Sequence, residues 1–154
     1  MTIVPLPTLG RREAAVAALD AKHRLPVSWA TIAKTLDRSL VWSTSAVLGQ
    51  QPLDAEQARA VGSLLHLDDD VVTALQLPPV RGADLVDTTE PVVSRLREIV
   101  QVYGNTLAEL IREEFGDGIM SAIDFELSCE RREDPDGDRV RLVLDGKFLP
   151  YRIY

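Results

Sequence analysis

The chain has 154 residues, of which 45% are hydrophobic, and a formal net charge of −7 at pH 7. This hydrophobic content is typical of a folded globular protein and excludes an acidic disordered chain. The acidic balance argues against nonspecific binding to nucleic acid or to an anionic membrane, because both need a basic protein face. It does not exclude an anionic substrate, since a local pocket can oppose the global charge.

Cysteine and histidine are scarce in this chain. The single cysteine, Cys129, cannot form an intrachain disulfide, which fits a reducing cytoplasm. The two histidines, His23 and His66, lie far from it in sequence and give no zinc spacing, so we expect no metal. The sequence shows neither an apolar run of roughly 18 residues, as a membrane span needs, nor a secretory signal. We therefore expect a cytoplasmic location and no membrane partner.

Residues 1–82 are expected to form a helical bundle. Alanine-rich residues 11–22 favour a first helix, which Pro26 ends. Ser28 is a suitable N-cap for a second helix that reaches about Leu36, because the apolar residues of this stretch recur at helical spacing.

Three further short helices are expected in the same domain. Leu40–Leu48 favours a helix closed by Gly49. Asp54 is the expected N-cap of the next helix, and one of the residues 68–70 is the expected N-cap of the last. Residues 78–90, which contain two prolines and a glycine, are the expected linker.

The remaining residues, 83–154, predict one long helix and a pair of strands. Pro91 suits the first position of a helix that ends near Phe115 and carries one apolar stripe: Val92, Leu96, Ile99, Val100, Tyr103, Leu107, Leu110 and Ile111. After Ser121 apolar residues alternate with polar ones, and they alternate again in residues 140–144, which is typical of strands. Asp134–Gly137 and Asp145–Gly146 are the expected turns.

The fold class is therefore α+β and mostly α, with a helical bundle domain (1–82) and a second domain (83–154). One helix and two strands have little core of their own. We infer that a second copy of the chain completes the second domain and forms a dimer with it.

Two patterns suggest chemistry, and each has a structural alternative. Arg95 and Glu98 are neighbours at i, i+3 on the long helix, as are many solvated ion pairs. The segment Gly116–Ser121 has two glycines that permit close backbone approach, so its N–H groups and the Ser121 hydroxyl could hold an anion. The alternative is a helix C-cap followed by a strand. Ser121 has no nearby His or Lys to deprotonate it, so we interpret it as a donor and not as a nucleophile.

Residues 28–49 form a further pattern, two short helices joined by a tight turn, as in repressor-type helix-turn-helix domains. The second of these helices contains no Lys or Arg, and only Lys34 and Arg38 lie close. A recognition helix usually carries basic or amide side chains, so DNA binding is the weaker hypothesis. A helix-turn-helix DNA-binding regulator remains the alternative function.

Several long strings resemble the cyanases (cyanate hydratases): Leu48-Gly-Gln-Gln51, Pro79-Val-Arg-Gly82, Gln101-Val-Tyr-Gly104, Phe115-Gly-Asp-Gly-Ile-Met-Ser-Ala-Ile123 and Leu144-Asp-Gly-Lys-Phe-Leu-Pro150. The resemblance runs through most of the chain and implies that Arg95, Glu98 and Ser121 are catalytic. It also implies a repressor-like bundle that binds no nucleic acid, and intertwined dimers assembled into a decamer with sites shared between subunits.

The activity that this resemblance implies is a carbon–nitrogen lyase reaction of cyanate. Cyanate would react with bicarbonate, which is a co-substrate and not a bound cofactor. The products would be carbamate and CO2, and carbamate would break down to ammonia and a second CO2. The biological role implied is cyanate detoxification and nitrogen supply.

Overall fold

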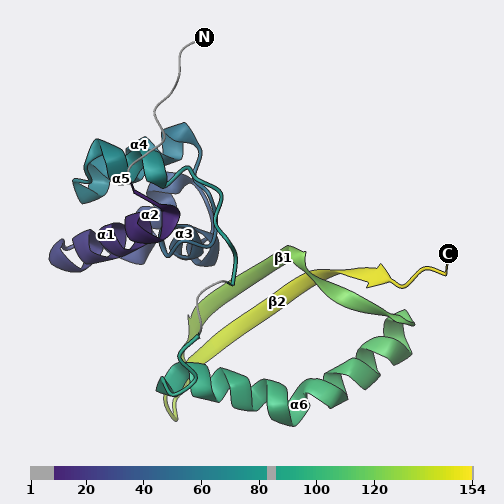
Figure 1. Ribbon diagram of the computed structural model, residues 1–154. Helices are drawn as coiled ribbons and strands as arrows, with labels where there is room; N and C mark the ends of the chain where they lie inside the picture. Colours follow the sequence, from purple (N-terminus) through teal and green to yellow (C-terminus); the bar gives the residue numbers. More distant parts are fainter. Residues whose placement is uncertain (1–8, 83–85, 154) are drawn as a thin grey trace. The chain divides into compact units, whose positions relative to one another are not determined.

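The computed structural model describes residues 9–82 and 86–153. The chain divides into two compact units, residues 1–83 with 128–141, and residues 84–127 with 142–154. Figure 1 shows the elements in chain order, five short helices followed by one long helix and two long strands in the described part of the chain.

The short helices of the first unit begin and end close to the predicted residues. They are α1 (Arg11–Arg24), α2 (Trp29–Leu36), α3 (Leu40–Val47), α4 (Ala55–Leu65) and α5 (Asp69–Ala74). The predicted caps explain this agreement. The Ser28 hydroxyl accepts a hydrogen bond from the Thr31 N–H at 3.0 Å. At α4, Asp54 and Gln57 form a reciprocal capping box, in which each side chain accepts from the other's backbone N–H.

These helices bury a continuous apolar core between them. Ile32, Val61 and Leu75 are fully buried, and Leu65 is 1% exposed. Trp29 and Trp42 pack against this core from its edge and are only half-buried. The bundle therefore has the burial that stabilises a small domain by itself.

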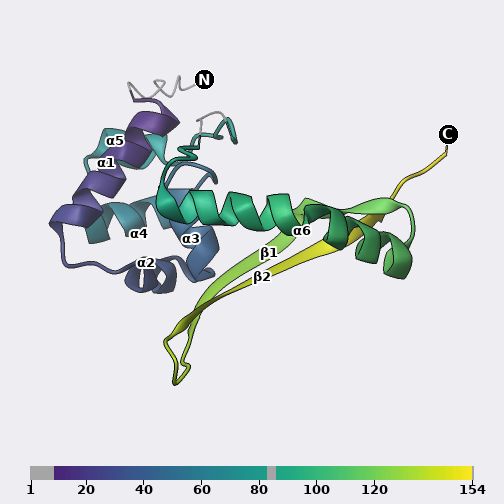
Figure 2. The ribbon, with the colours of Figure 1, turned by 90° about the horizontal axis from the view of Figure 1, so that it is seen from below.

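The elements of the C-terminal region are α6 (Pro91–Phe115), β1 (Gly118–Arg132) and β2 (Arg139–Pro150), and the two strands pair as an antiparallel hairpin. Figure 2 shows α6 and the two strands in a second view. None of the 25 residues of α6 is buried, and Ser121 is the only buried residue of the two strands. The helix and the hairpin thus have almost no core within one chain.

The strands differ from the prediction in two places. β1 begins at Gly118, before Ser121, and β2 continues through Asp145 and Gly146, where we expected a turn. The turn prediction was wrong because Gly146 serves close strand packing. A Cβ atom at Gly146 would lie 2.5 Å from the Ser121 carbonyl oxygen and 2.5 Å from the Met120 side chain. A glycine therefore permits close contact between the strands here.

Among the described residues, no helix combines the length and the apolar character that crossing a membrane requires.

Candidate functional site

Arg95 and Glu98 lie in the first half of α6. Pro91 begins this helix, and the Glu90 carboxylate accepts a hydrogen bond from the Val93 N–H at 2.9 Å, so the helix start is fixed locally. One turn later, Arg95 Nη1 lies 2.5 Å from Glu98 Oε2. The two side chains are 73% and 53% exposed, so water screens this ion pair in the single chain.

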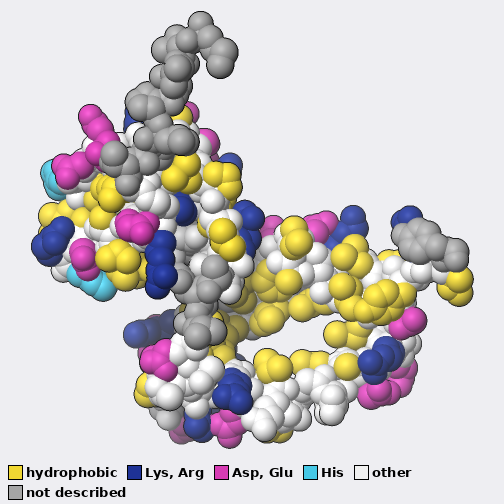
Figure 3. Space-filling model, viewed as in Figure 1, with side chains coloured by type: hydrophobic (Ala, Val, Ile, Leu, Met, Phe, Trp, Pro, Cys, Tyr) yellow, Lys and Arg dark blue, Asp and Glu magenta, His cyan; other side chains and the backbone are white. Residues whose placement is uncertain are grey.

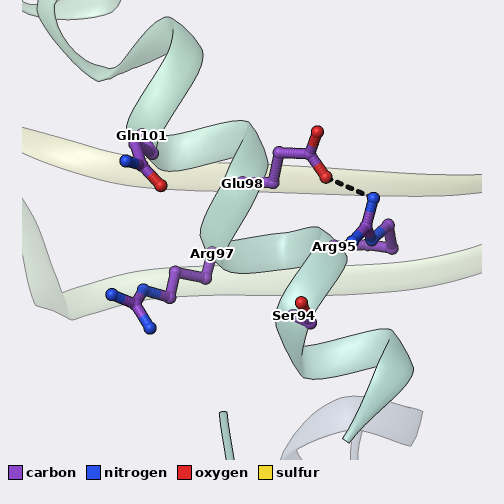
Figure 4. Close-up of a pocket in the computed structure, with 5 residues that line it drawn as sticks. All are labelled: Ser94, Arg95, Arg97, Glu98 and Gln101. Atoms are coloured by element: carbon purple, nitrogen blue, oxygen red, sulfur yellow. Dashed lines mark ion pairs between the residues drawn. The ribbon is translucent and has the colours of Figure 1, made fainter. Parts of the chain in front are cut away.

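The pair borders an open depression that is lined by residues of α6 alone. We call the lining residues the polar stripe: Ser94, Arg95, Arg97, Glu98 and Gln101. Figure 4 shows Arg95 and Glu98 on one side of the helix, Arg97 and Gln101 projecting on the other, and Ser94 between them. The stripe therefore presents two guanidinium groups, one carboxylate, one hydroxyl and one amide to solvent.

An apolar face lies on the opposite side of the same helix. At about 100° per residue, the polar stripe and the apolar residues point in opposite directions. We call these residues the apolar face of α6: Leu96, Ile99, Tyr103, Leu107 and Leu110, which are 42–57% exposed. Burial of the apolar face would therefore leave the polar stripe open to another partner.

Ser121 lies in β1 and is 5% exposed. Its Oγ accepts hydrogen bonds from the Ile123 N–H at 3.1 Å and from the Asp124 N–H at 3.0 Å. A hydroxyl has two acceptor positions and one proton. Both acceptor positions are thus used by the backbone, and the proton remains for donation. This geometry agrees with the interpretation of Ser121 as a donor.

The glycines before Ser121 have separate roles. Gly116 ends α6 with φ of +90°, a conformation that side chains rarely adopt. Gly118 has no positive φ, but a Cβ there would collide with the Leu149 carbonyl oxygen and the Phe148 ring. The segment is therefore a helix C-cap followed by a strand, and the two N–H groups after Ser121 converge on its own hydroxyl.

Ser121 is not among the residues that line the depression beside Arg95. About 30 Å of helix separates Arg95 from Phe115. β1 then returns only about 10 Å between Gly118 and Ser121. Arg95 and Ser121 are therefore separated by roughly 20 Å along the axis of α6. By this estimate, a substrate that contacted both Arg95 and Ser121 would take the two residues from different chains.

Sequence patterns assigned no role to three residues of the stripe, Ser94, Arg97 and Gln101, and Arg97 is the charged one among them. Another exposed arginine of α6, Arg112, pairs with Glu109 at 2.6 Å. Arg97 has no ion-pair partner within the described part of the chain, and it lines the depression. The signal available in the sequence was the recurrence of polar residues at 94, 97, 98 and 101, which share one helix face.

In residues 9–82 and 86–153, no cluster of three or more His, Cys, Asp or Glu side chains could hold a metal ion. In the bundle, α2 and α3 are joined through Asp37 in the left-handed conformation, as a tight turn requires. The Arg38 guanidinium lies 5.9 Å from the Trp42 ring centroid, so this cation is engaged within the bundle.

Comparison with known proteins gives consistent matches along the chain. Residues 11–79 match the family described as cyanate hydratase, N-terminal, and residues 86–153 match the cyanate lyase C-terminal domain. A cyanate hydratase from Thiobacillus denitrificans is 51% identical over 88% of this chain and 93% of the relative. One from Ralstonia pickettii is 48% identical over 94% of this chain and 99% of the relative.

A solved structure agrees with the sequence matches. The crystal structure of cyanase from T. urticae superposes with a TM-score of 0.80 at 35% identity, covering 89% of this chain and 96% of the solved one. The long helix and the hairpin without a core are thus features of a known fold. The chain belongs to the cyanate hydratase (cyanase) family.

Proposed function

We propose that this chain catalyses the bicarbonate-dependent decomposition of cyanate to carbamate and CO2. The observation that carries the proposal is the similarity to cyanate hydratases, which reaches 51% identity and covers the relatives almost from end to end. The polar stripe adds a chemical reason, because it offers guanidinium groups to anionic reactants.

The reaction joins two anions. A bicarbonate oxygen forms a bond to the cyanate carbon, and the bicarbonate proton moves to the cyanate nitrogen, which gives a carboxylated carbamate dianion. The bond between this oxygen and the bicarbonate carbon then breaks and releases CO2. Its electron pair stays on the carbamate oxygen, and the nitrogen takes up one proton from solvent. Carbamate takes up a second proton and breaks down to ammonia and another CO2.

Charge repulsion between the reactants is the main barrier that the protein must lower. Fixed donors and positive charges aimed at the developing dianion stabilise it without reorganisation. Arg95 suits this role because its guanidinium stays protonated and can bind carboxylate oxygens with two parallel hydrogen bonds. Glu98, at 2.5 Å from Arg95, either fixes the guanidinium or relays the proton to nitrogen. These two roles remain alternatives.

Ser121 is proposed to orient one of the anions through its hydroxyl proton. Both acceptor positions of its Oγ are filled by the Ile123 and Asp124 N–H groups, which supports donation to an anion. Holding both reactants in a fixed geometry adds the gain of an intramolecular reaction.

Self-association is part of the proposal. Figure 3 shows an opening between α6 and the paired strands, with hydrophobic side chains on both sides. The apolar face of α6 is exposed, and so are hairpin residues such as Ile123, which is 96% exposed. Such a surface favours burial by a second copy. An intertwined dimer would bury the apolar face, and assembly of dimers into a decamer would bring Ser121 of one chain to the polar stripe of another.

The deciding test is ammonia release from cyanate with and without bicarbonate, at a concentration where the protein is fully assembled by light scattering. We expect ammonia only when both anions are present. Arg95→Ala should lower kcat by at least about 100-fold while the assembly persists. Arg112→Ala is the matched control, because Arg112 pairs with Glu109 on the same helix at the same i, i+3 spacing.

Each outcome bears on a different part of the proposal. Absence of ammonia from the assembled wild-type protein would refute the activity. Near-normal turnover by Arg95→Ala would refute the site assignment and leave the activity standing. A stable monomer with full activity would contradict a site shared between chains.

A further inference from the structure

The polar stripe of α6 carries one more positive charge than negative. Arg95 and Arg97 contribute two guanidinium groups and Glu98 one carboxylate, while Ser94 and Gln101 are neutral. Because Glu98 lies 2.5 Å from Arg95, most of the field of Arg95 is offset locally. The uncompensated charge of the stripe is therefore that of Arg97.

Arg97 is also free to act on a ligand. Its side chain is exposed, and within residues 9–82 and 86–153 it has no ion-pair partner. Figure 4 shows its side chain and that of Gln101 projecting from the same side of α6, away from the Arg95–Glu98 pair. Arg95 and Arg97 thus flank the depression from opposite sides.

A surplus charge is needed at this place because the rest of the protein repels anions. The chain carries a net charge of −7, and both proposed reactants are negative. A positive border on a local depression raises the concentration of anions there against an unfavourable global field. Arg95 alone cannot do this while Glu98 neutralises it.

We propose that Arg97 gives the site its net positive charge, and so sets the affinity for cyanate and bicarbonate without taking part in bond making. This inference rests on the proposed function for the identity of the anions. It assigns a binding role to a side chain outside the predicted catalytic set of Arg95, Glu98 and Ser121.

The test compares Arg97→Gln with Arg112→Gln, which removes the same charge from the same helix away from the depression. Arg97→Gln should raise KM for both anions by about two- to fivefold and leave kcat within about twofold. Arg112→Gln should leave both constants near those of the wild type. Added potassium chloride should shrink the difference between the two variants, because salt screens exposed charges.

Azide binding provides a readout that does not depend on turnover, since azide is a linear anion with the electron count of cyanate. Calorimetric titration should show weaker azide binding to Arg97→Gln than to Arg112→Gln, even if cyanate were not turned over. Arg97→Lys keeps the charge and should recover most of the affinity. The inference is overturned if Arg97→Gln binds azide as Arg112→Gln does, or if Arg97→Lys is as weak as Arg97→Gln.

Discussion

The helical bundle buries its apolar side chains within one chain, whereas the C-terminal region leaves most of its own exposed. The bundle hides Ile32, Val47, Val61, Leu65 and Leu75 within one chain. The 25 residues of α6 hide none, although this helix is as strongly amphipathic as α4 of the bundle. An apolar pattern therefore predicts that a face will be buried but does not say by which chain.

The three residues proposed to be catalytic all lie in the region that buries almost no core within one chain. Arg95 and Glu98 lie on α6 and Ser121 lies on β1, while the bundle contributes none of the three predicted residues. The proposed site would therefore be completed only when chains associate. The bundle, which folds on its own core, is free of that requirement.

The largest expected effect comes from a charge on the apolar face of α6. Leu107→Asp should prevent dimer formation and reduce ammonia release to background, because an uncompensated carboxylate would be buried in the interface. The bundle should stay folded. Analytical ultracentrifugation would give the mass, and circular dichroism would show the retained helices.

Asn105→Asp is the matched control, because it adds the same charge on the other face of the same helix. Its dimer should persist. If Leu107→Asp formed the wild-type assembly, then the C-terminal region would not need a second copy of the chain to bury the apolar face of α6.

The bundle gives the next largest effect. Leu65→Ala removes a side chain that is 1% exposed and should lower the free energy of unfolding by about 2–5 kcal/mol. The assembled protein that remains folded should keep its kcat, since none of the proposed catalytic residues belongs to the bundle. Denaturant unfolding and turnover at low temperature separate the two quantities. Leu40→Ala, at a position that is 40% exposed, should change stability much less. A large loss of kcat in folded Leu65→Ala would show that the bundle shapes the site.

Arg11 is the polar exception in the bundle core and offers a smaller effect. It is 8% exposed, and its Nη2 donates to the carbonyl oxygens of Ala46 and Gln51. Its Nε and Nη1 have no hydrogen-bond partner among the described residues, and burial lowers the pKa of its guanidinium. Arg11→Ala should therefore cost about 1–3 kcal/mol, because the Gln51 carbonyl loses the Arg11 donor and the Ala46 carbonyl keeps only its backbone donors, such as the Gly49 N–H. Arg11→Met should cost less, because it fills the space without burying a charge. Equal thermal midpoints for the two variants would contradict this difference, because both lack the hydrogen bonds of Arg11 and only Met fills its space.

What the sequence predicts well is what neighbours in the chain decide. The caps at Ser28 and Asp54, and Pro91 at the start of α6, act within one helical turn, so these helix boundaries were predicted closely. Gly146 was taken for a turn because its role depends on Met120 and Ser121 in the facing strand, which no local pattern reveals. Sequence patterns predicted only part of the polar stripe. The i, i+3 spacing indicated Arg95 and Glu98, but Arg97 gains meaning only from the depression and from its lack of a partner.

The smallest expected effect tests whether the start of the C-terminal region is locally ordered. The Asp87 carboxylate accepts hydrogen bonds from the Thr89 hydroxyl at 2.6 Å and the Thr89 N–H at 2.9 Å, and these hydrogen bonds lower the pKa of Asp87. A lowered carboxyl pKa means that the ionised form is favoured in the folded state. Its contribution to stability is present above the pKa of the unfolded chain and is lost as the pH falls through the lower, folded value.

Thr89→Val should raise the pKa of Asp87 toward its usual value, and Thr88→Val should not. A carboxyl NMR titration measures this directly, most easily in the small Leu107→Asp chain. Since both partners are two residues apart, the lowered pKa should survive the loss of the dimer. If Asp87 titrates normally in Leu107→Asp but not in the wild type, then even this turn depends on association. The part of the chain that becomes ordered only on association would then begin before α6. Short-range sequence patterns would predict less of its structure than they do of the capped helices.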